Sequence, residues 1–141
     1  MFNIIVVGAD ASLTARRALE TAAELAALSG GTLHIVSVYE RANHADNDLP
    51  VEFRNMGNEG GIDALLQSLS FVAKNKGVDA LLHSFTGDPA DAIVATADKV
   101  GADLIVVGNR GMKGARRVLG SVPNSVAHGA NCSVAIIDTT E

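Results

Sequence analysis

Residues 108–122 combine the residue types that bind phosphate. A glycine has no Cβ and lets a ligand approach the backbone closely. Ser121 before Val122 and Pro123 signals a helix start, where backbone N–H groups are unpaired and the helix dipole is positive. These features predict a phosphate cradle, and the alternative is a plain glycine loop after a strand. The glycines and cations are Gly108, Arg110, Gly111, Lys113, Gly114, Arg116, Arg117 and Gly120.

Five continuous apolar runs predict the strands that position this segment. Runs without polar alternation are typical of a parallel sheet that is covered by helices on both faces. Helical patterns separate the runs, so the order β-α-β-α-β-α-β-α-β predicts an α/β three-layer sandwich, a Rossmann-like fold. All five strands are expected to be buried on both faces. The runs are Ile4–Val7, Leu33–Val38, Ala80–Leu82, Leu104–Val107 and Val134–Ile137.

Capping residues predict where the four helices begin and end. Ser12 is the expected N-cap of the first helix, and Gly30-Gly31 ends it. Gly77 closes the second helix. Asp88 and Pro89 open the third, because proline is favoured in the first helical turn, and Gly101 ends it. Ser121 is expected to cap the fourth.

Composition limits the classes of protein that remain. The 141 residues predict a single domain over 1–141, with residues 41–60, rich in Asn, Asp and Gly, as a flexible loop. A net charge of −5 argues against a nucleic-acid partner, and no apolar run is long enough for a membrane span. No secretory signal is recognised, so a cytoplasmic protein is expected. Cys132 is the single cysteine, and the four histidines are scattered without ligand spacing, so no metal site is expected.

Two glycine-ended strands are expected to meet at one crevice. Ligands of open α/β sheets bind beyond the carboxyl ends of the strands, where the strand order reverses. In a sheet of order 3-2-1-4-5, the first and fourth strands flank that point. The first ends in Gly8-Ala9-Asp10-Ala11-Ser12 and the fourth in the glycine segment, so the two distinctive segments converge.

These motifs resemble those of the universal stress protein family. The segment from Val7 to Ser12 is similar to the family's V-G-x-D-G-S opening, with Ala11 in place of the second glycine. Residues 106–111 followed by 119–123 are similar to its C-terminal signature. The resemblance implies a mainly parallel sheet of order 3-2-1-4-5, an adenine nucleotide alpha hydrolase-like fold. In the ATP-binding branch the signature is G-x2-G-x9-G-[ST], whereas eight residues separate Gly111 from Gly120 here.

The resemblance also implies roles for individual residues. At the nucleoside end, Asp10 would accept hydrogen bonds from the ribose, although it could instead cap the first helix. Gly8, Ala9 and Val38 would form the adenine wall. At the phosphate end, Gly108 and Gly111 would let the backbone follow the ribose and α-phosphate. The backbone N–H groups of Gly120, Ser121 and Val122, with the Ser121 hydroxyl, would hold the outer phosphates. Arg110 and Lys113 would neutralise the phosphate charge.

The expected function is binding of an adenine nucleotide by a regulatory or stress-response protein. ATP, with or without Mg²⁺, is the first ligand expected, and AMP or cyclic AMP is the alternative. A member that binds no nucleotide and acts through protein interaction is a further alternative. No water-positioning base or metal-binding acid for the γ-phosphate is identified, so no catalytic residue is assigned and at most slow ATP hydrolysis is expected. The resemblance also implies a homodimer that pairs through the last strand, Ser133–Ile137.

Overall fold

The computed structural model of the chain describes residues 2–9, 13–39, 58–109 and 121–139. Its five strands form one parallel sheet of order β3-β2-β1-β4-β5, so the strand order implied by the resemblance is confirmed. The strands are β1 (Ile4–Gly8), β2 (Thr32–Tyr39), β3 (Ala80–Thr86), β4 (Leu104–Gly108) and β5 (Ser133–Ile137). The helices are α1 (Leu13–Ser29), α3 (Asn58–Asn75), α4 (Pro89–Val100) and α5 (Val122–Gly129).

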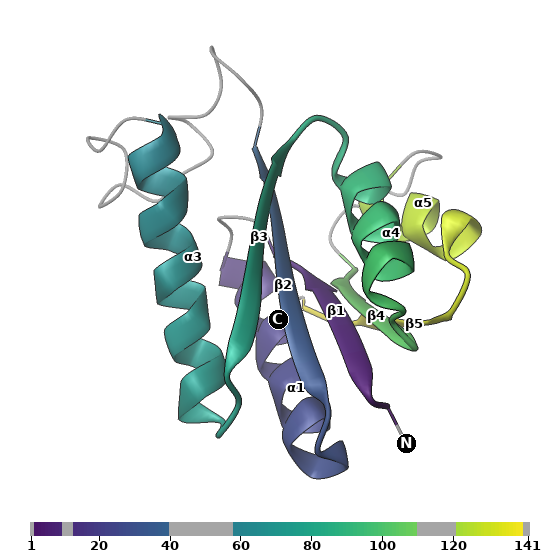
Figure 1. Cartoon of the computed structure of the whole chain (residues 1–141). Helices are drawn as coiled ribbons and strands as arrows, with labels where there is room; N and C mark the ends of the chain where they lie inside the picture. Colours follow the sequence, from purple (N-terminus) through teal and green to yellow (C-terminus); the bar gives the residue numbers. More distant parts are fainter. Residues whose placement is uncertain (1, 10–12, 40–57, 110–120, 140–141) are drawn as a thin grey trace.

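Helices cover both faces of the sheet, as Figure 1 shows. Helices α1 and α3 pack on one face and α4 and α5 on the other, which confirms the expected three layers. One core lies between the sheet and α1 and α3, where Ile5, Leu19 and Ile35 are fully buried. The second core lies under α4 and α5 and includes Ile105 and Val126. The central strands therefore contribute side chains to both cores, which explains the unbroken apolar runs of β1 and β4.

The edge strands are less buried than their sequences predict. In β3, Leu81 is 52% exposed and Leu82 is 37% exposed, so the expectation that this run is buried on both faces is wrong. In β5, Ile136 is also exposed, at 38%. Both strands have a neighbour on one side only, and α4 lies over β1 and β2 rather than over β3. A hydrophobic run thus identifies a strand without telling whether a helix covers it.

The expected capping chemistry is confirmed at both ends of α4, and at the end of α1, where Gly30 has a φ of 69°. The Asp88 carboxylate accepts a hydrogen bond of 2.9 Å from the Asp91 backbone N–H, and Pro89 occupies the first turn. Gly101 ends α4 in the left-handed conformation, with φ of 70°, which glycine adopts without steric cost. Helix α3 begins at Asn58, so the last three residues of the loop expected over 41–60 are helical. The remainder of that expected loop and Ser12 lie outside the described residues.

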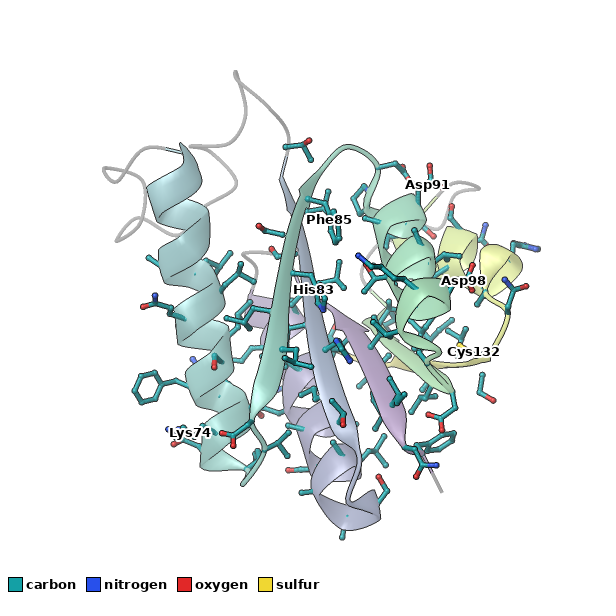
Figure 2. The ribbon with its side chains drawn as sticks, in the orientation of Figure 1. Lys74, His83, Phe85, Asp91, Asp98 and Cys132 are labelled. Atoms are coloured by element: carbon teal, nitrogen blue, oxygen red, sulfur yellow. The ribbon has the colours of Figure 1, made fainter. Side chains whose placement is uncertain are left out.

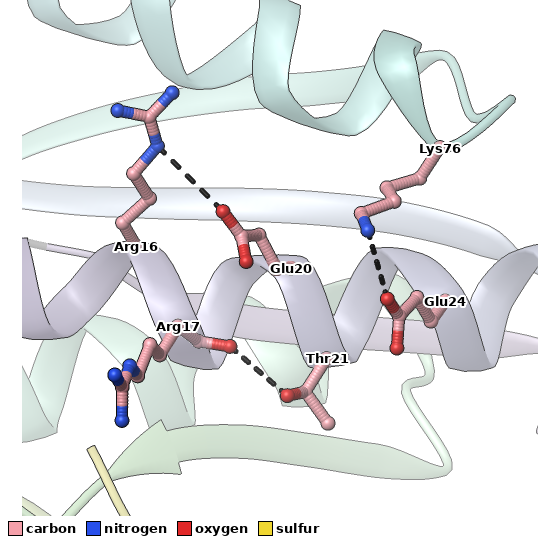
Figure 3. A network of polar contacts seen from close by, with 6 residues as sticks. All are labelled: Arg16, Arg17, Glu20, Thr21, Glu24 and Lys76. Atoms are coloured by element: carbon pink, nitrogen blue, oxygen red, sulfur yellow. Dashed lines mark hydrogen bonds and ion pairs between the residues drawn. The ribbon is translucent and has the colours of Figure 1, made fainter. Parts of the chain in front are cut away.

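Charged side chains connect α1 with the end of α3 at the surface (Figure 3). Lys76 Nζ lies 2.9 Å from Glu24 Oε1, and Arg16 Nε lies 3.7 Å from Glu20 Oε1 one turn apart in α1. The hydrogen bond and the charge of Glu24 raise the pKa of Lys76. All four side chains are largely in solvent, where ion pairs contribute little to stability. No helix among the described residues is long and apolar enough to cross a membrane.

Candidate functional site

The carboxyl ends of β1 and β4 lie side by side at the centre of the sheet. The two strands pair in parallel, with Val7 opposite Val106, and each ends in a glycine, Gly8 or Gly108. This is the point at which the strand order reverses, since β2 follows β1 on one side and β4 on the other. Open α/β sheets bind ligands beyond this edge. The structure therefore brings together the ends of both strands that the sequence singles out.

Gly8 lies close against the Ile93 side chain of α4. A Cβ on Gly8 would lie 2.5 Å from Ile93 Cδ1 and 3.3 Å from Ile93 Cγ1. The next residue, Ala9, is 5% exposed, and its backbone N–H donates a 2.9 Å hydrogen bond to Val36 O. A side chain at Gly8 would therefore displace Ile93 from its present position, and the Ala9 N–H already has an acceptor in the protein.

Gly108 and Asn109 are bound to the end of β5. A Cβ on Gly108 would lie 2.9 Å from Thr139 Cγ2, so a side chain here would displace the Thr139 side chain. Asn109 is 7% exposed, and its Oδ1 accepts hydrogen bonds from Thr139 N at 3.0 Å and from Thr139 Oγ1 at 3.1 Å. Its Nδ2 donates to Asp138 Oδ1 at 3.0 Å. This group, which we call the Asn109 clamp, fixes the start of the glycine segment against residues 138–139.

Asn109 is the residue that the sequence reasoning missed. Asn109 lies between Gly108 and Arg110, but the phosphate cradle was predicted from the glycines, the cations and the helix start. Its partners lie about thirty positions away, at |i−j| of 29 and 30, so no local pattern reveals them. The only available signal is an amide side chain placed directly after a buried strand, where a turn or cap is common.

Ser121 occupies the N-cap position of α5 but does not cap it with its side chain. Its backbone is extended, with φ of −61° and ψ of 152°, and its carbonyl accepts from Ser125 N at 2.9 Å. Its Oγ is buried and has no hydrogen-bond partner among the described residues. An unpaired buried hydroxyl costs free energy, so this atom is a candidate for contact with a bound group.

The start of α5 lies toward the carboxyl edge of the sheet. Strand β5 begins at the amino edge, where Ser133 pairs with Leu104, and α5 ends at Gly129 just before it. The helix therefore runs antiparallel to the strands, and its first residues lie toward the edge where β4 ends (Figure 1). Val122 and Val38 are half-buried and pack against the second core. Asp10, Arg110, Gly111, Lys113 and Gly120 lie outside the described residues.

At the opposite edge of the sheet, Asp103 joins β4 to the start of β1. Its carboxylate accepts hydrogen bonds from Asn3 N at 2.8 Å and Ile4 N at 3.1 Å. Partial desolvation acts to raise the pKa of Asp103, but the backbone N–H groups of Asn3 and Ile4 outweigh it and lower the pKa. This carboxylate is far from the carboxyl edge and has a structural role.

Two histidines that are far apart in the sequence are in contact. His34 Nδ1 and His83 Nε2 are 2.9 Å apart, although 49 positions separate the residues. Burial is the main cause that lowers the pKa of His34, and the charge of His83 adds to it. Burial is also the main cause that lowers the pKa of His83, and the charge of Lys99 adds to it. The parallel register of β2 and β3 brings this pair together, which the spacing of the histidines along the chain does not show. Among the described residues, no group of three or more His, Cys, Asp or Glu side chains gathers around one point.

The strand order, the helices on both faces and the paired glycine-ended strands define an α/β fold of the adenine nucleotide alpha hydrolase-like class. Residues 1–138 match the universal stress protein family. The chain is 37% identical to universal stress protein Rv1636 of Mycobacterium tuberculosis, over 99% of this chain and 98% of the relative. The chain therefore belongs to the universal stress protein family.

Two solved structures of relatives contain a nucleotide. A universal stress protein in complex with cAMP superimposes with a TM-score of 0.81 at 35% identity, over 99% of this chain and 98% of that chain. The universal stress protein from Archaeoglobus fulgidus in complex with dAMP gives a TM-score of 0.71 at 26% identity, with 98% of both chains covered. In each case the nucleotide is bound by the relative.

Proposed function

We propose that this protein is a regulatory adenine-nucleotide-binding member of its family and that the nucleotide binds between the ends of β1 and β4. The observation that supports this most is the Ser121 hydroxyl, which is buried at the start of a helix and has no hydrogen-bond partner among the described residues. A helix N-terminus is positive and favours a phosphate group, and the hydroxyl would donate a hydrogen bond to it. The nucleotide complexes of two relatives add independent support.

The nucleoside would lie against the ends of β1 and β2. Because the Ala9 N–H is bonded to Val36 O, the base would be read by the Ala9 carbonyl rather than by this N–H. Gly8 and Val38 would line the wall beside it, and Asp10 would accept from the ribose hydroxyls. At the phosphate end we propose Gly108, Arg110, Gly111, Lys113, Gly120, Ser121 and Val122.

Two ligand classes are supported by different observations. The glycine signature favours ATP, with or without Mg²⁺, because it resembles that of the ATP-binding branch. The relative that binds cAMP is 35% identical, and the other complex contains dAMP, also a monophosphate. The eight-residue spacing between Gly111 and Gly120 favours the ligand with fewer phosphates. We therefore keep ATP and the monophosphates, AMP and cyclic AMP, as competing ligands.

Calorimetric titration of nucleotide-stripped protein with ATP–Mg²⁺, AMP and cyclic AMP tests the proposal. Binding of ATP more tightly than of either monophosphate would support an ATP sensor. A preference for cyclic AMP would support a second-messenger binder. If none of the three releases or absorbs heat at high micromolar protein, the nucleotide proposal is wrong and a role in protein interaction replaces it.

The variant Ser121→Ala tests the observation that carries the proposal. A hydrogen bond to a charged group contributes about 1.5–3 kcal/mol, so the affinity for the preferred nucleotide should fall about tenfold or more. Stability should change little, because the hydroxyl has no hydrogen-bond partner in the part of the chain that the structure describes. Ser68→Ala, at an exposed position of α3, is the matched control. Equal affinity in the two variants would remove Ser121 from the site.

Substitutions on the proposed crevice test its remaining parts. Gly111→Val and Gly120→Val should abolish nucleotide binding, because a branched side chain would occupy the phosphate path. Asp10→Ala should weaken binding by removing the ribose contact while leaving the phosphate contacts in place. Unchanged affinity in all three variants would place the nucleotide elsewhere.

We also propose that β5 pairs with its copy in a homodimer. The strand lies at the sheet edge, and Ile136 presents an exposed apolar side chain there. Antiparallel pairing across a two-fold axis would cover this edge. Sedimentation should give a dimer for the natural chain and a monomer for Ile136→Lys. A monomeric natural chain at high micromolar concentration would contradict the proposal.

A further inference from the structure

The histidine pair lies at the margin of the cover that α4 provides, because α4 packs on β1 and β2 and the edge strand β3 extends beyond it. In the parallel register His34 is opposite Leu81 and Val36 is opposite His83, so His34, Leu81, His83 and Phe85 share one face. Figure 2 shows His83 and Phe85 on the side of β3 that faces α4. Leu81 is 52% and Phe85 39% exposed on this face, so solvent reaches His83 directly. His34 beneath it is 8% exposed.

The two imidazoles are held in a defined arrangement. Their ring centroids are 5.1 Å apart with an interplanar angle of 31°, and the facing nitrogens are 2.9 Å apart. Phe85 is stacked parallel to His83, at 2° and 6.4 Å between centroids. His34 comes from the interior strand β2, whose backbone is paired on both sides. The pair therefore has one rigid member and one member on an edge strand that can adjust.

We propose that His34 Nδ1 and His83 Nε2 form a two-histidine site for a divalent transition-metal ion such as Zn²⁺. Imidazole nitrogens are common ligands of such ions, and two nitrogens bound to one tetrahedral zinc at about 2.0–2.1 Å lie about 3.3 Å apart. The observed 2.9 Å would have to widen by about 0.4 Å, and the rings would have to turn so that both lone pairs point at the ion; His83 on the edge strand can supply that movement. Water molecules would complete the coordination, since His83 faces solvent.

Metal binding would require a change of tautomer but no net release of a proton. In the neutral pair, one facing nitrogen carries a hydrogen and donates it to the other. The metal needs a lone pair from both, so the donor ring must move its proton to its outer nitrogen, Nε2 of His34 or Nδ1 of His83. The lowered pKa values of both residues keep the rings neutral at pH 7, which is the form that binds metals.

Lys99 on α4 is the charged group that acts on this site. Its charge contributes to the lowered pKa of His83, so it also opposes a bound cation. Replacing it should tighten the binding of a divalent ion, because the repulsion between like charges is removed. Replacing Lys99 should therefore raise the affinity for the ion, whereas loss of a histidine ligand should lower it.

Titration with Zn²⁺ alone, in a buffer that does not bind metals at pH 7.5, tests the site. We expect one Zn²⁺ per chain at the pair, a loss of affinity of at least tenfold in His83→Gln, and a several-fold gain in Lys99→Gln. His128→Gln removes an exposed imidazole of α5 and should leave the affinity of the natural chain unchanged. Equal affinity in His83→Gln and His128→Gln would overturn the proposal, as would absence of binding.

Nitrogen NMR of the histidine rings in the natural chain supplies a readout that does not depend on any variant folding. Addition of Zn²⁺ should shift His34 Nδ1 and His83 Nε2 together and leave the His128 nitrogens in place. Shifts confined to the other histidines would show that the ion binds elsewhere and would refute the two-histidine site. Cooperative urea unfolding of His83→Gln and Lys99→Gln would confirm that the variants are folded.

Discussion

The contact between Gly8 and Ile93 gives the sharpest test of the packing at the crevice. In Gly8→Ala, the new Cβ would lie 2.5 Å from Ile93 Cδ1, whereas carbon atoms in contact lie about 3.5–4.0 Å apart. The clash requires a shift of about 1 Å in a residue that is 3% exposed. Overpacking of this kind costs about 1–3 kcal/mol of unfolding free energy. The φ of Gly8 is not positive, so the backbone itself tolerates alanine.

Removing the clashing atom should rescue the variant. Ile93→Val deletes Cδ1 and alone costs about 0.5–1.5 kcal/mol. In the double variant the closest remaining contact of the new Cβ is 3.3 Å, and the Cβ fills the space that Cδ1 leaves. The two costs should therefore not add, and the coupling energy should be about 1 kcal/mol or more.

Urea unfolding of the four members of this cycle measures the coupling. Gly129→Ala is the control for a glycine substitution as such, because its Cβ would meet only Val94 Cγ2 at an ordinary 3.6 Å. We expect this control to be as stable as the natural chain. Additive costs in the double variant, or a Gly8→Ala variant as stable as the control, would refute the assignment of Gly8 to packing against α4.

Three further predictions concern polar groups. In Asn109→Ala the buried Thr139 N–H loses its acceptor, so the free energy of unfolding should fall by about 1–3 kcal/mol in urea titrations. Asp103→Asn should cost about 1 kcal/mol after solvent screening is considered. Folding lowers the pKa of Asp103, so the natural chain should be more stable than Asp103→Asn above the pKa of the unfolded carboxyl. This difference in stability should vanish in acid, and thermal unfolding at a series of pH values measures it. The lowered pKa values of His34 and His83 mean that the unfolded chain binds more protons, so stability should fall as pH drops below about 6.5. That acid slope should be shallower in His83→Gln.

The sequence predicts the order of elements well because the signals are local. The helix α4 is an example, since Asp88, Pro89 and Gly101 lie within or beside the helix that they bound. The apolar runs likewise identify each strand. Whether a run is covered depends on helices elsewhere in the chain, which is why the exposure of Leu81 and Ile136 could not be predicted from the runs alone.

The candidate site is predictable in its location but less so in its details. Gly8 was expected to line the adenine wall and Gly108 to let the backbone follow the ribose. The structure shows that each also makes room for a side chain, Ile93 at Gly8 and Thr139 at Gly108. The Asn109 clamp and the histidine pair both join residues that are distant in sequence. Such contacts depend on the strand register, and spacing along the chain does not encode it.

The Asn109 clamp also matters for anyone who attaches another protein to this chain. Thr139 is 2% exposed and is held by Asn109, so residues just before the carboxyl end are part of the packed structure. A reporter joined directly after Thr139 would pull on the start of the glycine segment and could report on its own linker rather than on a ligand. A biosensor fusion should therefore be separated from Thr139 by a linker, or be placed ahead of Phe2, which precedes β1 at the opposite edge of the sheet.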